Sequence, residues 1–257
     1  MDQMITHIKS WIYTAAEQIK ESFDEDLQVE TKSSRKDLVT SLDKQTQEYL
    51  TRQILNYDPN AKIMGEENGR DHLTDLSGRV FIIDPIDGTM NFVLEHENFC
   101  IMMAVYEDGV PQLGFVYDVM KDEFLWGGKK VGVFRNEQQI KAPKDLGMRE
   151  GLVGMNTSLY KKNAYNCQKI GDHAMGVRMT GCAGKELIGI ILGHRNGYIS
   201  NLAPWDYAPG CVLLDALGMK FSALDGEPLK LDGRELFIAG TPTAYYEMRA
   251  IIANTAI

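Results

Sequence analysis

Residues 80–92 read Val80-Phe81-Ile82-Ile83-Asp84-Pro85-Ile86-Asp87-Gly88-Thr89-Met90-Asn91-Phe92, an apolar run that leads into two carboxylates. The first four residues have the length and composition of a buried strand. Pro85 has no N–H to donate to a neighbouring strand, so strand pairing is predicted to end there. Beside a helix start at Gly88 and Thr89, Asp84 and Asp87 could hold hard cations and a phosphate together. For an isolated D-x-x-D pattern the alternative is a turn with two solvated aspartates.

Composition and charge narrow the classes of protein that this chain can represent. Its 257 residues are 44% hydrophobic and 25% charged, which suits a globular protein of one large domain or two modest ones. The formal net charge of −9 argues against a general nucleic-acid binder, which needs a basic surface. A phosphorylated substrate stays open, because bound metal ions can supply local positive charge.

The cysteines and the start of the chain favour a cytoplasmic protein without a membrane partner. Cys100, Cys167, Cys182 and Cys211 form no C-x-x-C pair, so zinc-ribbon and thioredoxin-type sites are not expected and the thiols should be reduced. The first residues contain no basic region followed by an apolar one, so no secretory signal is expected. No run of about 18 apolar residues is present that could cross a membrane.

Helical and strand-like patterns alternate along the chain, which predicts a layered α/β or α+β fold. Apolar residues at helical spacing predict a first helix over residues 4–19, and Thr40 or Ser41 can cap a second one that ends before Pro59. Further strands are expected at 62–64, 99–105, 113–119, 122–126, 152–155 and 176–179, and further helices at 161–170, 185–192 and 208–217. The segment 142–145 is the expected boundary between subregions 1–142 and 143–257 of a single catalytic unit (1–257).

Acids stand next to an apolar strand or a helix at four separate places: Asp43, Glu66 with Glu67, Asp84 with Asp87, and Asp206. Buried together, such acids would cost folding free energy through repulsion and desolvation, and a divalent cation removes that cost. Carboxylate and carbonyl oxygens suit Mg²⁺ or Mn²⁺, whereas zinc prefers His and Cys. The five histidines show no metal-ligand spacing.

Other catalytic classes find no support in the sequence. No G-x-S-x-G motif of a serine hydrolase is present, and no G-x-G-x-x-G follows a strand as in a dinucleotide-binding fold. Gly184-Lys185 is similar to the end of a phosphate-binding P-loop. Met179 stands where the first glycine of that loop is needed, however, and Glu186 replaces its Ser or Thr.

Three motifs resemble the signatures of the inositol monophosphatase family: Gly65-Glu66-Glu67, then Asp84 to Phe92, then Trp205-Asp206-Tyr207-Ala208-Pro209-Gly210. Lys32-Ser33-Ser34, Asp37 to Thr40 and Asp43 extend the resemblance upstream, so that it covers nearly the whole chain. The combination of D-P-I-D-G-T-x-N-F with W-D-x-A-x-G is highly specific. The resemblance implies an α-β-α-β-α sandwich, a homodimer, inhibition by Li⁺, and Mg²⁺-dependent hydrolysis of a phosphate monoester.

The resemblance also implies roles for individual residues. The metal ligands for two or three Mg²⁺ ions, with Mn²⁺ as a substitute, would be Glu67, Asp84, the Ile86 carbonyl, Asp87 and Asp206. The substrate would contact Asp87, Gly88, Thr89, Gly181, Cys182, Ala183 and Asp206. Glu67 and Thr89 would position the attacking water, and Asp43 would help to accept the proton of Thr89. Lys32 would lie on a mobile loop, although a solvated loop lysine is the alternative, and Glu66 would stand behind Glu67.

The substrate is the least determined part of this interpretation. Inositol-selective relatives carry a glutamate six residues before the tryptophan of the third motif, and this chain has Ile199 there. A missing hydroxyl partner weakens discrimination, so the 2′-phosphate of NADP(H), a 3′-phosphonucleotide and fructose 1,6-bisphosphate stay open beside inositol 1-phosphate. A regulatory or assembly role without catalysis is a further alternative. Pro209 is expected in a first helical turn, without functional consequence.

Overall fold

The structure is a computed structural model that describes residues 1–24, 29–31, 38–73 and 75–254. Its helices are α1 (Asp2–Glu21), α2 (Ser41–Tyr57), α3 (Thr89–Glu95), α4 (Thr157–Lys161), α5 (Cys167–His173), α6 (Ala183–Ile191), α7 (Pro204–Ala216) and α8 (Pro242–Ala253), with 3₁₀ turns η1 (Ser22–Asp24), η2 (Met148–Glu150) and η3 (Ala164–Asn166). None of the described helices is both long and apolar enough to cross a membrane.

The strands form three sheets in the part of the chain that the structure describes. Their bounds are β1 (Val29–Thr31), β2 (Leu38–Thr40), β3 (Lys62–Gly65), β4 (Arg79–Asp87), β5 (Cys100–Glu107), β6 (Val110–Asp118), β7 (Glu123–Gly128), β8 (Gly132–Arg135), β9 (Gln138–Ile140), β10 (Leu152–Met155), β11 (Gly176–Arg178), β12 (Gly197–Leu202), β13 (Lys220–Ala223) and β14 (Glu235–Gly240). Strands β3 to β9 make a seven-stranded sheet in chain order, β11-β10-β12-β14-β13 make a five-stranded sheet, and β1 pairs with β2.

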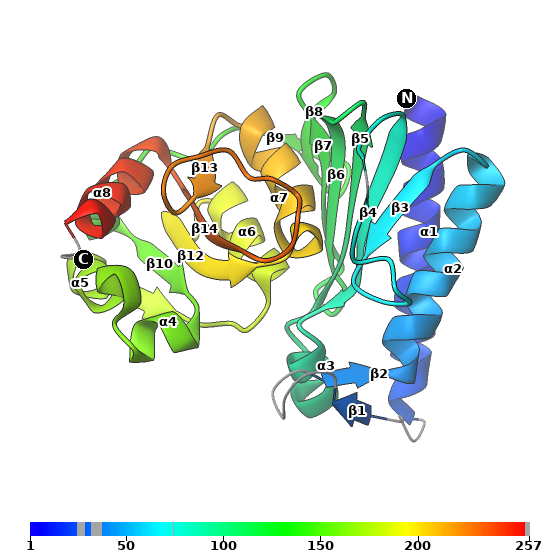
Figure 1. Cartoon of the computed structure of the whole chain (residues 1–257), viewed down its shortest axis with the longest axis horizontal. Helices are drawn as coiled ribbons and strands as arrows, with labels where there is room; N and C mark the ends of the chain where they lie inside the picture. Colours follow the sequence, from blue (N-terminus) through cyan, green and yellow to red (C-terminus); the bar gives the residue numbers. More distant parts are fainter. Residues whose placement is uncertain (25–28, 32–37, 74, 255–257) are drawn as a thin grey trace.

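Five layers follow one another across the molecule (Figure 1). Helices α1 and α2 cover one face of the seven-stranded sheet, and α6 and α7 lie between that sheet and the five-stranded one. Helices α4, α5 and α8 cover the outer face of the five-stranded sheet. The predicted α-β-α-β-α sandwich is therefore confirmed. The predicted boundary at 142–145 falls between the last strand of the larger sheet and the first strand of the smaller one.

The apolar cores explain why the layers stay together. The apolar stripe of α1, including Ile8, Ile12 and Ile19, packs with alternate residues of β4 to β6 in one cluster. A second cluster joins the opposite face of that sheet to α6 and α7, so residues from both halves of the chain share it. Gly114 of β6 allows a close approach of α7, because a Cβ there would collide with the Pro209 carbonyl oxygen.

Strand β4 corrects the expectation that pairing would end at Pro85. The ladder with β5 continues to Asp87, with a register shift after Asp84: Asp84 pairs with Met102, and Asp87 pairs with Cys100. Three residue steps on β4 therefore lie opposite two steps on β5. One extra residue on one strand of a pair is the definition of a β-bulge. Without it, side chains three positions apart would point to opposite faces of the sheet. The bulge places both carboxylates on the face that α6 and α7 cover.

Two predicted helices differ from the observed ones. The helix predicted over 161–170 is two short helices, α4 and α5, separated by left-handed residues at Asn163, Tyr165 and Asn166. The helix predicted to begin at residue 208 begins at Pro204, since the fixed φ of proline suits a first helical position. Pro209 therefore lies inside α7, beyond its first turn, which corrects the expected placement.

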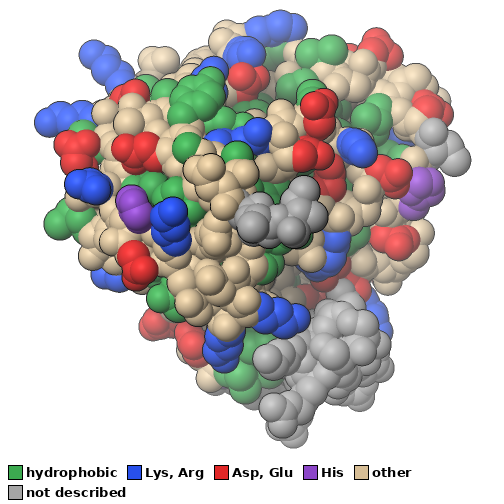
Figure 2. Space-filling view, turned by 60° about the vertical axis from the view of Figure 1, so that its left-hand side comes forward, with side chains coloured by type: hydrophobic (Ala, Val, Ile, Leu, Met, Phe, Trp, Pro, Cys, Tyr) green, Lys and Arg blue, Asp and Glu red, His purple; other side chains and the backbone are tan. Residues whose placement is uncertain are grey.

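Acidic and basic side chains are mixed on the surface. On the face shown in Figure 2, Lys and Arg side chains are scattered among Asp and Glu side chains rather than gathered into one patch. This distribution accompanies a net negative charge, which does not attract a phosphate backbone.

Candidate active site

Three aspartates meet between the two large sheets. Asp84 and Asp87 come from the end of β4, and Asp206 comes from the first turn of α7. A carboxylate oxygen of each lies within 4.8 Å of one from each of the others, and the residues are only 1%, 6% and 8% exposed. Segments more than a hundred residues apart in the chain thus bring three acids into one buried cluster.

Backbone amides hold the cluster in place. Asp84 Oδ1 accepts a hydrogen bond from Ile86 N–H at 3.1 Å, and Asp206 Oδ2 accepts one from Ala203 N–H at 2.8 Å. Asp84 Oδ2 is buried and has no hydrogen-bond partner among the described residues. A buried carboxylate oxygen without a donor is costly, so this atom points to a ligand that the described residues do not supply.

The loop before α6 and the first turn of that helix hold Asp87. Ala183 N–H donates to Asp87 Oδ1 at 3.1 Å, and Gly184 N–H donates to Asp87 Oδ2 at 2.5 Å. The Cys182 thiol donates to the same Oδ2 at 3.0 Å. The sequence assigned Gly181, Cys182 and Ala183 to the substrate, whereas in the structure the Cys182 thiol and the Ala183 amide bind Asp87, and Gly181 is exposed.

Burial and mutual repulsion disfavour the charged forms of these acids. Burial, followed by the charges of Glu66 and Asp87, raises the pKa of Asp84 well above its usual value. Burial also raises the pKa of Asp87 to about 6 and the pKa of Asp206 to about 7. A divalent cation would offset both effects, and a donor set of carboxylate oxygens suits Mg²⁺ or Mn²⁺. The residues present therefore fit the metal that the sequence predicts.

Asp43 and Thr89 form a hydrogen-bonded pair. Thr89 Oγ1 lies 3.0 Å from Asp43 Oδ1 and 3.1 Å from the Ile86 carbonyl oxygen, so its single proton has two acceptors. Thr40 is the N-cap of α2, and its N–H and hydroxyl both donate to Asp43 Oδ2, at 2.8 and 2.5 Å. Burial raises the pKa of Asp43, and the hydrogen bonds from Thr40 and Thr89 oppose that rise.

Glu67 follows β3, the parallel neighbour of β4, and is 5% exposed. Within the described ranges, the three-aspartate group defined by the 4.8 Å spacing does not include Glu67. The charge of Glu66 raises the pKa of Asp43, Asp84, Asp87 and Asp206, so it acts on the whole cluster.

Gly88 is the N-cap of α3, with a φ of 91° that suits glycine. A Cβ there would stand 3.0 Å from the Cβ of Cys182, so the turn also needs a residue without a side chain. Gly88 and Thr89 thus lie at the start of α3, beside the cluster, as predicted. Lys32 lies outside the described residues.

Three residues that support the site were not among the site residues predicted from the sequence. The Gln47 side chain accepts from Glu67 N–H at 2.9 Å and donates to the Glu67 carbonyl. Asn91 donates to the carbonyls of Asn98 and Thr180, at 2.9 and 2.7 Å, and so ties α3 to the segment before the Asp87-binding loop. Arg234 Nη1 lies 3.4 Å from Asp206 Oδ2. Two of them could have been suspected, because Asn91 stands in the motif over residues 84–92 and Gln47 lies four residues after Asp43 on the same helix face.

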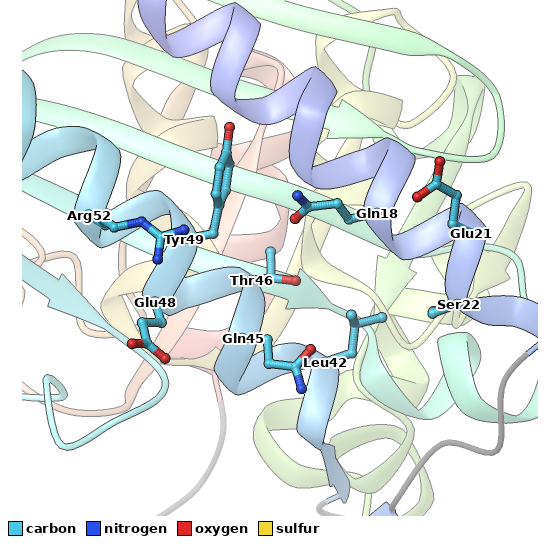
Figure 3. A pocket seen from close by; sticks show the side chains of 9 residues that line it. All are labelled: Gln18, Glu21, Ser22, Leu42, Gln45, Thr46, Glu48, Tyr49 and Arg52. Carbon is cyan, nitrogen blue, oxygen red and sulfur yellow. The ribbon is translucent and has the colours of Figure 1, made fainter.

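A surface cavity of about 450 Å³ lies between α1 and α2. Figure 3 shows its lining side chains, which come from α1, the turn η1 that follows it and α2, and are mostly polar. None of the predicted site residues lines it. It is therefore separate from the aspartate cluster.

Comparisons with known proteins show the family and agree with the fold. The model of the inositol monophosphatase family matches residues 1–256. The inositol-1-monophosphatase of Bacillus subtilis (strain 168) is 36% identical over 242 residues, covering 92% of this chain and 91% of the relative.

Solved structures are similar over almost their whole length. The crystal structure of an IMPase/NADP phosphatase complexed with Mg²⁺ and phosphate has a TM-score of 0.91 and 27% identity, covering 99% of this chain and 96% of the other. A staphylococcal inositol monophosphatase-1, in an inhibitory complex soaked with LiCl, has a TM-score of 0.92 and 27% identity, with 99% and 96% coverage. The chain belongs to the inositol monophosphatase family and is a phosphoric monoester hydrolase.

Proposed function

We propose that this chain hydrolyses the phosphate monoester of a small polyol, with inositol 1-phosphate as the first candidate, in a Mg²⁺-dependent reaction. The observation that carries the proposal is the cluster of Asp84, Asp87 and Asp206, in which a buried carboxylate oxygen has no donor among the described residues. Glu67 and the Ile86 carbonyl would complete the set that holds two or three Mg²⁺ ions. When bound, Mg²⁺ neutralises phosphate charge and lowers the pKa of water.

The protein's own part in the reaction is to position water and move a proton. Thr89 Oγ1 donates its proton toward Asp43, which leaves the oxygen lone pairs free to accept a hydrogen bond from the attacking water. As the water oxygen bonds to phosphorus, the bond from phosphorus to the ester oxygen breaks, and the released alcohol oxygen takes a proton from solvent. The proton of the attacking water passes to Thr89, and the proton of Thr89 passes to Asp43. A carboxylate with a raised pKa is a stronger base than an exposed aspartate, so burial of Asp43 helps this transfer. Glu67 would orient the same water.

Phosphate binding would use the start of α3. The backbone N–H groups of Gly88 and Thr89 would face the substrate phosphate, with Gly181, Cys182 and Ala183 close to the rest of the substrate. Asp87 and Asp206 would also contact the substrate. Lys32 would approach from its loop. We also propose that residues 1–257 act as one catalytic unit, since both halves of the chain share a core cluster, and that the chain forms a Li⁺-sensitive homodimer.

Hydrolysis of the 2′-phosphate of NADP(H) is the second candidate activity. Ile199 is fully buried in an apolar cluster with Met155 and Ile238, so this position offers no polar group to a cyclitol hydroxyl. A structure with the same fold is described as an IMPase/NADP phosphatase. A 3′-phosphonucleotide and fructose 1,6-bisphosphate would suit the same chemistry.

Phosphate release from each of these substrates, measured with Mg²⁺, tests the proposal. Asp87→Asn is expected to lose activity by at least about a hundredfold, because it removes a charge from the metal-binding cluster. Asp215→Asn is the matched control, since Asp215 lies on α7 in a surface ion pair with Lys129. Equal release by wild type and Asp87→Asn would refute the mechanism. A higher kcat/KM for NADP than for inositol 1-phosphate would favour the second candidate.

A further inference from the structure

Two buried cysteine thiols lie directly behind Asp87. Cys100 belongs to β5, where it pairs with Asp87 in the ladder, and Cys182 is the N-cap of α6. They are 0% and 2% exposed. Their sulfur atoms are 3.8 Å apart, and Cys182 Sγ lies 3.0 Å from Asp87 Oδ2. One ligand atom from each of the three residues lies within 4.8 Å of the other two.

The distance between the two sulfur atoms matches that between two thiolates bound to one soft metal ion. Thiolate sulfurs bind zinc at about 2.3 Å in tetrahedral sites, so two sulfurs on one zinc ion are about 3.8 Å apart. The two thiols of this chain already have that separation. Both are held by regular structure, β5 on one side and the start of α6 on the other, so a metal ion would need little rearrangement of the backbone.

We propose that Cys100, Cys182 and Asp87 form a binding site for a thiophilic divalent ion, zinc or cadmium. The two thiols release their protons to solvent as the two metal–sulfur bonds form, and one Asp87 oxygen supplies the third ligand. Water fills the fourth position. No electrons are transferred in this step. Magnesium is excluded because it binds hard oxygen ligands and not sulfur.

The position of Asp87 makes such an ion an inhibitor. Asp87 belongs both to the aspartate cluster and to the thiol pair, and a dication bound by the thiol pair would repel a second dication at the aspartate cluster. A soft ion can enter from the cluster side, where Asp87 is 6% exposed. Once bound, it withdraws Asp87 from the site of hard-metal binding. The inhibition rests on the proposed function, whereas the metal binding itself does not.

Cadmium titration of the full-length protein under reducing, non-chelating conditions tests the binding. Formation of metal–thiolate bonds produces an ultraviolet charge-transfer band, which reports the site without any enzyme assay. We expect one Cd²⁺ per chain in the wild type. In Cys100→Ser the affinity should fall at least tenfold and the band should be lost, and Cys100→Ala gives a second test if the serine variant folds poorly. Cys167→Ser is the matched control, because Cys167 is equally buried in another core cluster.

The results separate the binding site from the proposed activity. A wild-type protein without the band, or Cys100 variants that keep it, would overturn the proposal. Loss of two hydrogens by intact mass, without bound metal, would also overturn it, because the pair would then have formed a disulfide. In phosphate-release assays, Cd²⁺ should inhibit the wild type despite excess Mg²⁺, with at least tenfold weaker inhibition of Cys100→Ser. If the protein releases no phosphate from any substrate, the band still decides whether the metal site exists.

Discussion

Three buried polar atoms have no hydrogen-bond partner among the described residues: Thr51 Oγ1, Asp84 Oδ2 and Trp205 Nε1. One of them belongs to the active site, because Asp84 is a member of the aspartate cluster, and Trp205 is the neighbour of Asp206 in the sequence of α7. Thr51 lies further along α2, where its hydroxyl has no comparable role. An unsatisfied atom at the site points to a ligand, and an unsatisfied atom in a helix is a local cost.

We predict that Thr51→Val stabilises the protein. Valine has nearly the same shape, and the change removes a buried hydroxyl whose desolvation is not compensated. The expected gain is about 1 kcal/mol in the free energy of unfolding, or a Tm rise of about 2–4 °C for a chain of this size. Thermal unfolding followed by circular dichroism measures it. Thr46→Val on the same buried face serves for comparison, and a lower Tm for Thr51→Val would contradict the prediction.

At the scale of single residues, the sequence identified the acids but not what holds them. Asp84, Asp87 and Asp206 stand in motifs whose order is visible in the chain. Arg234 immediately precedes β14 and lies near Asp206 in the fold, and nothing in its local sequence marks it as a site residue. The spacing of residues along the chain does not reveal a contact between distant segments, so a partner such as Arg234 can be identified only from the structure.

Helix α2 connects two parts of the site, since it carries Asp43 at its start and Gln47 one turn later. Gln47 bonds both the N–H and the carbonyl of Glu67, which fixes the backbone where β3 ends. Gly65 leaves room for this contact, because a Cβ there would stand 2.6 Å from Gln47 Oε1. The helix thus sets the position of Glu67 relative to Asp43.

We predict that Gln47→Met raises the Mg²⁺ concentration needed for half-maximal activity by about tenfold, as is typical for a partner of a metal ligand. Methionine keeps the volume of the side chain and removes both hydrogen bonds. Magnesium titration of phosphate release checks this, with Gln45→Met as the control, because Gln45 is exposed on the same helix. An unchanged magnesium requirement in a folded Gln47→Met protein would show that Gln47 does not position Glu67.

The predictions were accurate where a repeating pattern of apolar residues determines the helix or strand. They were inaccurate where a single residue determines whether the element continues or is interrupted. The amphipathic α1 and the N-cap at Thr40 were confirmed. Pro85 did not end β4, because a bulge accommodates it, and the segment 161–170 is broken by left-handed asparagines that carry no strong stop signal. Periodicity describes the faces of an element well, and it describes interruptions poorly.

At the scale of the whole molecule, folding gathers negative charge, and this should make stability depend on pH and metal together. The pKa values of Asp87 and Asp206 are raised to about 6 and about 7, whereas an unfolded aspartate has a pKa of about 3.9. Between these values the folded protein holds more protons than the unfolded chain. Stability is therefore lost as pH rises through this interval.

We predict that, in EDTA, Tm falls between pH 5 and pH 8, and that saturating Mg²⁺ removes most of this fall. Each unit of pKa shift corresponds to about 1.4 kcal/mol, so the stabilisation by Mg²⁺ should be larger at pH 8 than at pH 5. Calorimetry in both buffers measures the difference. Asp206→Asn should weaken the pH dependence and Asp215→Asn should leave it unchanged. An equal gain from Mg²⁺ at both pH values would contradict the assignment.

The bulge in β4 also constrains how this segment can vary during evolution. The one extra residue, rather than the identity of the residues at 85 and 86, sets which side of the ribbon each acid faces. Replacing Pro85 or Ile86 preserves this length and the bulge, and deleting one of them would leave the two acids two positions apart on a regular strand, where they would still share a face. A change that straightens the strand at its present length, by contrast, would turn Asp87 to the opposite face from Asp84.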